Sequence, residues 1–414
     1  MDVQRAAHDG ERYDAVIIGA RIAGTATALG LARRGARVLL LDADTFPSDT
    51  LSTHLLWSDA LQCLDRLGVL AEVRATDAPP IEHFQINYGP YTKTATIPTR
   101  RNYPPLLSVR RLILDDILLC RARATPNITI REGIAVTSLL RDGDAVVGVR
   151  GTARDTSEKI IAHGRITIGA DGRRSTVARE VGAAGYDVVA PLLATYYRYY
   201  RGVQPLAAAT LEAFRDAHGG FCYLFPCDDQ LWTLAVSFPQ AQFDRVRRNH
   251  EAALAEQVAD KEGLIERLAG AEAVSPWRGA GDLQNFFRVP YGQGWALVGD
   301  AGYHRDPITG RGIADALRSA ELLCAALTGV WRSRTTHDAA LAAYQQARDA
   351  LVRPLYDFTV ERPPADVTPG DWSGALARTI SDPNYLSTYV GFMANVTPAE
   401  AFYSAAAVYA PVVE

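Results

Sequence analysis

The stretch YDAVIIGARIAGTATALGLARRGARVLLLD, residues 13–42, decides the fold. It opens with a short apolar run, Tyr13 to Ile18, which ends at a glycine and is typical of a buried parallel strand. Helical periodicity follows over Ile22 to Arg34 and stops at Gly35, and Arg37 to Leu41 predicts a second strand. We therefore expect a β-α-β unit with a right-handed crossover.

The turn of this unit, Gly19-Ala20-Arg21-Ile22-Ala23-Gly24, fits the GxGxxG pattern except that Arg21 replaces the second glycine. Gly19 permits the tight turn, Gly24 keeps the helix close to the sheet, and the helix N-terminus offers free amides to a pyrophosphate. With Arg21 in place of the second glycine, the backbone cannot approach the pyrophosphate as closely, but the arginine side chain supplies a positive charge. Asp42 ends the second strand, where a carboxylate can accept hydrogen bonds from a ribose. These features in this order predict dinucleotide binding, without separating FAD from NAD.

Composition excludes several other classes of protein. The chain has 414 residues, is 48% hydrophobic and carries a formal net charge of -4, which gives no field to hold nucleic acid or an anionic membrane. Its first twelve residues lack the apolar core of a signal peptide, and no later run is long and apolar enough to span a bilayer. We expect a cytoplasmic protein.

The cysteines and histidines predict neither disulfides nor a metal site. Five cysteines form no CxxC pair, and the eight histidines lack the i, i+4 pairing of a helical metal site. Cys222 and Cys227 have the CxxxxC spacing of flavin disulfide reductases, but an odd offset along a strand places two side chains on opposite faces. We interpret the cysteines as reduced thiols.

Further elements follow from periodicity and turn residues. In the first half we expect helices over Trp57–Leu67 and Arg111–Ala124, a hairpin around Asp142-Gly143 and a strand over Arg165–Ile168. A second sheet, our candidate substrate region, is predicted over Leu193–Phe238, with turns at His218-Gly219-Gly220 and Asp228-Asp229. Later elements are a helix over Arg247–Leu268, a strand over Trp295–Val298, a helix over Ile313–Leu327, and a helical tail from Ala339 that is broken at Pro363-Pro364 and Pro369.

Two later motifs separate FAD from NAD. Ile168-Gly169-Ala170-Asp171-Gly172-Arg173-Arg174-Ser175 follows a predicted strand and opens a helix. Gly299-Asp300-Ala301, at another strand end, is followed by Pro307-Ile308-Thr309-Gly310-Arg311-Gly312. Together with the opening turn, these motifs resemble the aromatic-hydroxylase class of FAD-dependent monooxygenases, whose superfamily includes flavin halogenases and geranylgeranyl reductases. The resemblance covers most of residues 13–355.

The resemblance assigns roles to individual residues. It implies that Asp300 holds the ribityl chain of FAD, that Gly310 and Gly312 bring amides against the isoalloxazine, and that Arg111, or else Arg110, lies near the phosphates. It also implies that Asp171 packs beside the flavin and serves nicotinamide binding. The candidate cofactor-binding residues are Gly19, Ala20, Arg21, Ile22, Ala23, Gly24, Asp42, Ala43, Thr53, Arg111, Val136, Asp171, Gly299, Asp300, Pro307, Gly310, Gly312 and Ile313. The candidate substrate-binding residues are Tyr197, Tyr199, Phe221, Tyr223 and Phe225, and no catalytic residue is assigned.

The chain departs from the family pattern at two places. Family hydroxylases often carry an arginine where this chain has Asp49-Thr50-Leu51-Ser52-Thr53-His54, so we expect a hydroxyl or His54 to replace it. The usual histidine after Gly-Asp-Ala is shifted by one, to His304.

By this resemblance the fold is α/β, with a Rossmann-like FAD-binding region of glutathione-reductase type interleaved with a second, mixed β-sheet region for substrate. The expected segments are a flexible N-terminus over 1–12, an FAD-binding domain over 13–78, 103–184 and 284–338, a substrate-binding domain over 79–102 and 185–283, and a C-terminal helical segment over 339–414.

The resemblance implies a monooxygenase that hydroxylates or epoxidises a small aromatic or polyketide-like metabolite through a C4a-hydroperoxyflavin. NADH or NADPH would serve as a transient reductant and molecular oxygen as co-substrate. The alternatives are an alkene reductase of geranylgeranyl-reductase type, which the aromatic element Phe221 to Pro226 fits, a flavin halogenase, which would need an active-site lysine such as Lys93, and a non-catalytic binder. We expect a monomer or homodimer.

Overall fold

The computed structural model describes residues 11–88, 91–100, 102–215, 220–331, 337–360 and 383–407. Some sequence predictions lie outside these residues: the first ten residues of the N-terminal segment, the turn positions His218 and Gly219, and the breaks at Pro363, Pro364 and Pro369.

The main sheet has the strand order β19-β20-β10-β1-β2-β7, and β9 pairs with both β10 and β8. Its strands are β1 (Glu11–Ile18), β2 (Val38–Leu41), β7 (Ile128–Arg131), β8 (Ile134–Asp142), β9 (Ala145–Ala153), β10 (Lys159–Gly169), β19 (Tyr291–Gly292) and β20 (Trp295–Leu297). Central β1 runs parallel to β2 and β10, and β10 runs parallel to β20. The predicted β-α-β unit, with α1 (Ile22–Ala32) as its crossover, is confirmed.

Both faces of this sheet are covered, which explains why its strands are continuous apolar runs. Alternate residues of β1 enter opposite clusters. Ile17 packs with residues of α1, α4 (Arg111–Arg123) and α9 (Gly312–Trp331), whereas Val16 packs with residues of β8, β9 and β10 on the other face.

The second sheet has the order β16-β12-β15-β14-β13-β4-β5, and β17 also pairs with β12. Its strands are β4 (His83–Tyr88), β5 (Tyr91–Thr96), β12 (Leu193–Arg201), β13 (Thr210–Arg215), β14 (Phe221–Pro226), β15 (Trp232–Pro239), β16 (Glu272–Ala273) and β17 (Arg278–Ala280). Because β4 and β5 join strands that lie more than a hundred residues later, the two sheet regions are interleaved along the chain. The predicted mixed second sheet is confirmed, while the domain boundaries stay a prediction.

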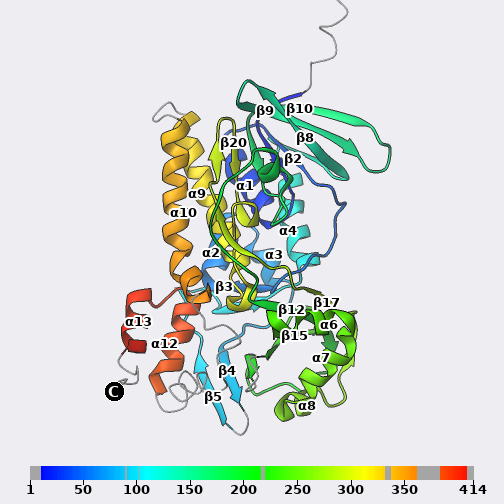
Figure 1. Ribbon diagram of the computed structural model, residues 1–414, viewed down its shortest axis with the longest axis vertical. Coiled ribbons are helices and arrows are strands. Elements are labelled where there is room, and N and C mark those ends of the chain that lie inside the picture. Colours follow the sequence, from blue (N-terminus) through cyan, green and yellow to red (C-terminus); the bar gives the residue numbers. More distant parts are fainter. Residues whose placement is uncertain are drawn as a thin grey trace, which may run out of the picture.

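Two smaller sheets and several helices complete the described fold. The small-sheet strands are β3 (Leu55–Trp57), β6 (Leu106–Ser108), β11 (Gly185–Val189), β18 (Asn285–Arg288) and β21 (Tyr303–His304). The further helices include α2 (Ser58–Arg66), α3 (Leu70–Arg74), α5 (Thr176–Glu180), α10 (His337–Val360), α12 (Pro383–Met393) and α13 (Ala399–Ala407), with single turns η1 (Gln240–Gln242), η2 (Gly299–Ala301) and η3 (Pro307–Thr309). Figure 1 shows α10 alongside α9, and α12 between β5 and α13.

One predicted helix is wrong. The polar stretch expected as a single helix over Arg247–Leu268 forms three short helices, α6 (Phe243–Arg248), α7 (His250–Ala259) and α8 (Glu262–Leu268). Asn249, with φ -150° and ψ 71°, and Lys261, with φ -123° and ψ 87°, leave the helical region and separate them. Asn249 follows the known tendency of asparagine to favour helix ends over helix interiors.

The structure also places the two cysteines of the second sheet and the turn that was predicted beside them. Cys222 packs with Phe238 in one cluster and Cys227 with Tyr199 in another, and the two are not joined by a disulfide. The Asp228-Asp229 turn joins β14 to β15 with Asp229 at φ 57°. Among the described residues, no helix has the length and apolarity to cross a bilayer.

Candidate cofactor and substrate site

Three strand ends meet at one edge of the main sheet. The amide of Ala170 donates to the carbonyl of Ile18 at 2.7 Å, and the amide of Val298 donates to the carbonyl of Gly169 at 2.9 Å. Gly19 has φ +101°, and a Cβ on it would lie 2.4 Å from the carbonyl oxygen of Ala170. Only glycine fits there. In an open parallel sheet, ligands bind at such a carboxyl edge where the strand order reverses.

The N-terminus of α1 lies directly behind this turn. A Cβ on Gly24 would lie 1.7 Å from the carbonyl oxygen of Gly19, so the helix packs tightly against the turn. Arg21 occupies the N-cap position without making a side-chain capping hydrogen bond. The first helical amides and the helix dipole therefore remain available to an anion, which fits the pyrophosphate of a dinucleotide.

Asp42 both lines the cavity and braces the turn. One carboxylate oxygen accepts a hydrogen bond from the amide of Ala20 at 2.6 Å, and the other accepts one from the amide of Asp44 at 2.8 Å. Burial raises the pKa of this carboxyl group, while the two amides act in the opposite direction. The bond to Ala20, which sequence reasoning did not anticipate, ties the end of β2 to the phosphate turn.

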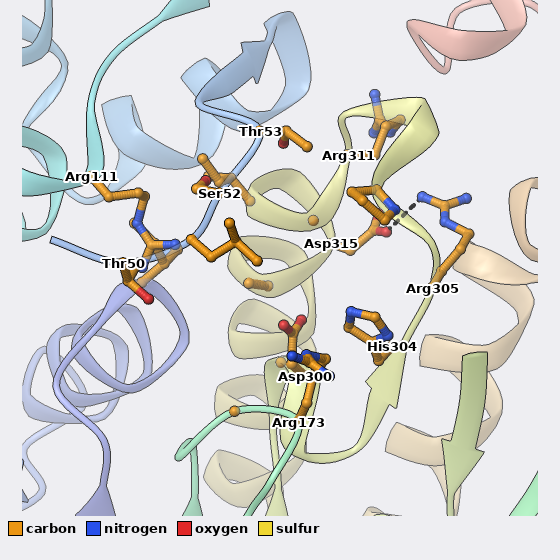
Figure 2. A pocket seen from close by; sticks show the side chains of 18 of the residues that line it. Thr50, Ser52, Thr53, Arg111, Arg173, Asp300, His304, Arg305, Arg311 and Asp315 are labelled. Atoms are coloured by element: carbon orange, nitrogen blue, oxygen red, sulfur yellow. Dashed lines mark hydrogen bonds and ion pairs between the residues drawn. The ribbon is translucent and has the colours of Figure 1, made fainter. Parts of the chain in front are cut away.

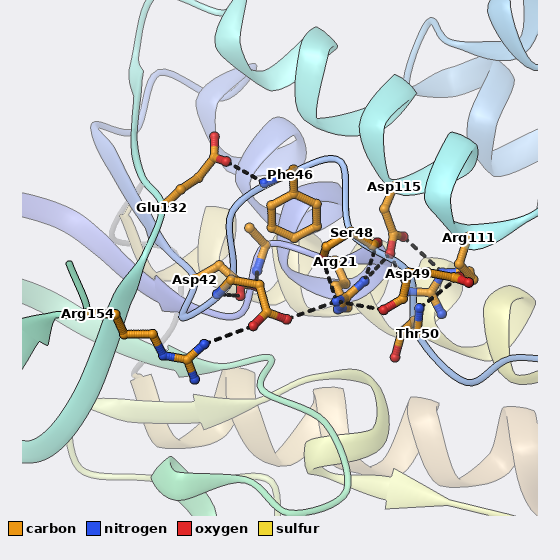
Figure 3. Close-up of polar contacts among 12 residues, drawn as sticks. Arg21, Asp42, Phe46, Ser48, Asp49, Thr50, Arg111, Asp115, Glu132 and Arg154 are labelled. Atoms are coloured by element: carbon orange, nitrogen blue, oxygen red, sulfur yellow. Dashed lines mark hydrogen bonds and ion pairs between the residues drawn. The ribbon is translucent and has the colours of Figure 1, made fainter. Parts of the chain in front are cut away.

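Arg21 turns sideways from the helix, into a network that Figure 3 shows. It pairs with Asp115 at 2.9 Å and with Asp44 at 3.0 Å, and donates to Ser48 Oγ at 2.9 Å. Asp115 is fully buried and also pairs with Arg111 at 2.9 Å. The two predicted cations thus share one carboxylate. Sequence reasoning missed Asp115, although its i, i+4 spacing from Arg111 on α4 was a usable signal.

The second strand-end motif begins at Gly299, which has φ +61°. Its amide donates to Ser319 Oγ of α9 at 3.2 Å, which holds the turn against that helix. The next residue, Asp300, is exposed and lines the cavity, and its carboxylate bonds to no other described residue. The geometry therefore leaves Asp300 available to a ligand.

The loop before α9 is shaped by its own hydrogen bonds. The side chain of Asp306 caps the single turn η3 by accepting from the amide of Ile308 at 3.1 Å, a role that sequence reasoning missed. Gly310 then adopts φ +61°, and its carbonyl accepts a hydrogen bond from the Trp57 indole at 3.1 Å. A Cβ on Gly312 would meet no heavy atom within 4 Å, so the backbone here borders open space.

Asp171 is placed at the cavity, but its carboxylate caps α5. It accepts from Ser175 Oγ at 2.5 Å and from the amides of Thr176 at 2.7 Å and Val177 at 3.3 Å. Burial raises its pKa, and these bonds oppose that effect. The neighbouring Arg173 lines the cavity and pairs with Asp282 at 3.5 Å.

One cavity of about 670 Å³ joins all these features. Among the predicted site residues, all line it except Ala20, Gly24 and Tyr199. Figure 2 shows Thr50, Ser52, Thr53 and Arg111 along one side, with Asp300, His304, Arg305 and Asp315 along the other.

The second sheet lines the cavity largely with aromatic side chains, together with the hydroxyl groups of Thr195, Thr233 and Ser237. Phe221, Tyr223 and Phe225 alternate along β14, which places them on one face of the second sheet, and all three line the cavity. Tyr389 and Met393 of α12 also line it. Sequence reasoning missed both α12 residues, because only long-range packing brings the C-terminal helix here.

Tyr199 does not line the cavity, but its hydroxyl forms a hydrogen bond with His54, which does. Its hydroxyl lies 2.8 Å from Nε2 of His54, and His54 contacts the ring of Tyr197 edge-on. His54 is fully buried, and burial, aided by the charge of Arg111, lowers its pKa to about 3. His54 is therefore neutral at physiological pH.

Comparison with known proteins agrees with this geometry. The family described as "FAD binding domain" matches residues 12–359. The chain is 26% identical over 347 residues to 6-methylpretetramide 4-monooxygenase of Streptomyces rimosus, covering 77% of each chain. It is 27% identical over 333 residues to menaquinone reductase of Mycolicibacterium smegmatis, covering 77% of this chain and 76% of that one.

Among solved structures, the myxobacterial chondrochloren halogenase CndH superposes with a TM-score of 0.78 at 23% identity, covering 91% of each chain, which shows a shared fold. In eight of the curated relatives that the chain matches, it spans from 32% to 78% of their length.

The phosphate turn, the two strand-end motifs and the family match over most of the chain point to one conclusion. The chain belongs to the FAD binding domain family, within the superfamily of FAD-dependent monooxygenases and halogenases.

Proposed function

We propose that this FAD-dependent oxidoreductase is a monooxygenase that hydroxylates or epoxidises a small apolar molecule, aromatic or polyketide-like. NADH or NADPH would be its reductant and molecular oxygen its co-substrate. The observation that carries the proposal is the single cavity, which joins a dinucleotide cradle at one end to an aromatic-lined compartment at the other.

The residues of the cradle fit FAD. The amides at the start of α1 would bind the pyrophosphate, Asp42 the adenosine ribose and Asp300 the ribityl chain, while the backbone at Gly310 and Gly312 would border the isoalloxazine. When bound, FAD supplies the electron transfer and the activation of oxygen.

The protein supplies orientation and exclusion of water. The aromatic face of β14 and the side chains of α12 offer flat apolar walls, which favour a planar ring over a charged or strongly solvated molecule. A substrate that fills this compartment would also keep water away from reactive species at the flavin.

An alkene reductase is the second candidate. The aromatic alternation Phe221-x-Tyr223-x-Phe225 before Pro226 and the similarity to menaquinone reductase favour it. The same apolar compartment would then hold a polyprenyl or quinone substrate.

A halogenase is less well supported, despite the shared fold. The chain's three lysines are Lys93, Lys159 and Lys261, and none of them lines the described cavity. Lys93 lies on β5, and Lys261 Nζ donates to the Gln257 carbonyl at 2.9 Å.

Anaerobic reduction followed by labelled oxygen tests the proposal. The holoenzyme is mixed with NADH or NADPH, with and without a naphthol, and the flavin absorbance is followed before isotopically labelled oxygen is admitted. A monooxygenase inserts labelled oxygen into the naphthol. If menaquinone is instead reduced without oxygen uptake while no label enters the aromatic probe, the reductase is the correct assignment.

A further inference from the structure

One ring nitrogen of His304 forms a hydrogen bond within the protein, and the other faces the cavity. It lies on β21, next to β18, and its Nδ1 is 2.6 Å from the carbonyl oxygen of Gln284. A carbonyl oxygen only accepts hydrogen bonds, so the hydrogen must be on Nδ1. A neutral imidazole has a single N–H, and Nε2 therefore carries a lone pair.

Nε2 makes no hydrogen bond to any residue that the structure describes, although His304 is only 8% exposed. The ring lines the cavity, and Figure 2 shows it between Asp300 and Arg305. The lone pair of a buried ring is thus left for whatever occupies the cavity.

Burial favours the neutral form of His304. Burial lowers its pKa, the carboxylate of Asp300 and the hydrogen bond to Gln284 oppose this effect, and the positive charges of Arg173 and Arg305 add to it. The ring is therefore an acceptor, and not a cation, at neutral pH.

Asp300 is a second acceptor beside it. Its exposed carboxylate has no partner among the described residues, and the nearby cations already have carboxylate partners: Arg173 pairs with Asp282 at 3.5 Å and Arg305 with Asp315 at 3.0 Å. Nε2 of the buried His304 and the exposed carboxylate of Asp300 are thus two neighbouring acceptors that suit a ligand with hydroxyl groups.

We propose that Nε2 of His304 accepts a hydrogen bond from a hydroxyl group of the molecule bound next to Asp300. Two sources share this chemistry: the ribityl chain of FAD and a phenol-type substrate. With a phenol, the lone pair would accept the O–H hydrogen and orient the oxygen, while the proton would stay on the phenol because burial lowers the pKa of His304. This inference rests on the proposed function.

Nitrogen NMR of protein labelled at histidine tests the proposal without turnover. Loss of one signal pair in His304→Gln assigns the ring. In apoprotein we expect a protonated Nδ1 and a bare Nε2. Addition of FAD then shifts the Nε2 resonance if the ribityl chain is the donor. If the substrate is the donor, FAD leaves it in place, and a naphthol added to holoenzyme shifts it while the methyl ether of that naphthol does not.

Two results would overturn the proposal: a protonated Nε2 in the apoprotein, or an Nε2 resonance that neither FAD nor the naphthol moves. In the second case FAD binding itself is still visible in the flavin absorbance, so the proposed function would survive the failure.

The binding affinities of matched variants test the proposal independently. His304→Leu should weaken binding of the hydroxyl donor, FAD or naphthol, by about tenfold, the loss of one hydrogen bond. His304→Gln should restore most of that affinity, because its amide can donate to Gln284 and its carbonyl can accept. His163→Leu, on β10 outside the cavity lining, is the control. Equal affinities for the Leu and Gln variants would contradict the role of Nε2.

Discussion

At the scale of single residues, the Asp300 carboxylate is available to bind a ligand and is not needed to stabilise the fold. Its carboxylate makes no hydrogen bond within the described part of the chain, so Asp300→Ala should fold and melt like the wild type. A charge-assisted hydrogen bond to the ribityl chain is worth about 1.5–3 kcal/mol, which corresponds to roughly a ten- to hundredfold loss of FAD affinity. Titration of the apoprotein of each variant with FAD measures this loss of affinity. Wild-type affinity in the folded variant would mean that the cofactor is misplaced.

Asp42 differs because it also holds the phosphate turn. Asp42→Ala leaves the amides of Ala20 and Asp44 without their acceptor, so the apoprotein should lose about 1–3 kcal/mol of unfolding free energy, as well as affinity for FAD. Urea unfolding of the apoprotein, with Asp300→Ala as the matched control, gives the value. Unchanged stability would show that water replaces the carboxylate at the turn.

His54 predicts a pH dependence of stability. Its pKa is about 3 in the fold and about 6.5 in the unfolded chain, so between these values the unfolded state binds more protons. Stability should therefore fall as the pH drops below about 6.5, by up to about 1.4 kcal/mol per pH unit from this residue. Urea unfolding of wild type and His54→Gln across pH 7 to 5 should give a steeper fall for the wild type. Parallel curves would refute the assignment.

At the scale of elements, Asp115 joins α4 to the start of α1. Asp115→Ala would leave Arg21 and Arg111 without their shared buried carboxylate, and we expect a loss approaching ~3 kcal/mol of unfolding free energy. Asp116 on the same helix is a matched control, since its pair with Arg123 at 3.7 Å is exposed, and Asp116→Ala should cost less than about 0.5 kcal/mol. Denaturant unfolding compares the two, and equal losses would contradict the role given to Asp115.

An element could be predicted when the residues that determine it lie close together in the sequence. β1, α1 and β2 were predicted because their signals are local: an apolar run, a glycine turn and a helical repeat. The break of the expected helix at Asn249 and Lys261 was missed, because single residues that leave helical dihedrals do not alter a polar pattern. The contacts of Asp42 with Ala20 were invisible because they depend on how closely β2 approaches the turn.

At the scale of the whole molecule, α12 packs so that Tyr389 and Met393 line the aromatic part of the cavity. Met393→Trp should fill that space and abolish binding of a naphthol to holoenzyme, while leaving FAD affinity unchanged. Perturbation of the flavin absorbance by the naphthol measures binding. Tyr403→Trp, on the exposed side of α13, is the control and should bind normally. Undiminished binding to the Met393 variant would show that the ligand sits elsewhere.

Overall architecture was predictable in outline, since the order of motifs indicated a discontinuous cofactor region and a second sheet. The closure of the cavity by Tyr389 and Met393 was not, because nothing in the sequence of α12 states which distant surface it covers. The same holds for His304, whose significance depends on the carbonyl of Gln284 lying opposite its ring.

The parallel pairing of β1 with β10 and of β10 with β20 also sets the timing of assembly during synthesis. The glycine turn after β1 leaves the ribosome first, but Asp300 and the start of α9 follow nearly three hundred residues later, which takes roughly 15–60 s at about 5–20 residues per second. Non-local pairings of this kind form slowly, and until β20 is synthesised β10 lacks its second parallel neighbour. Early steps of folding must therefore proceed without help from the cofactor, in a nascent chain that is exposed to aggregation and to chaperones. FAD acts only on the completed fold, which it stabilises by mass action in proportion to the logarithm of its free concentration.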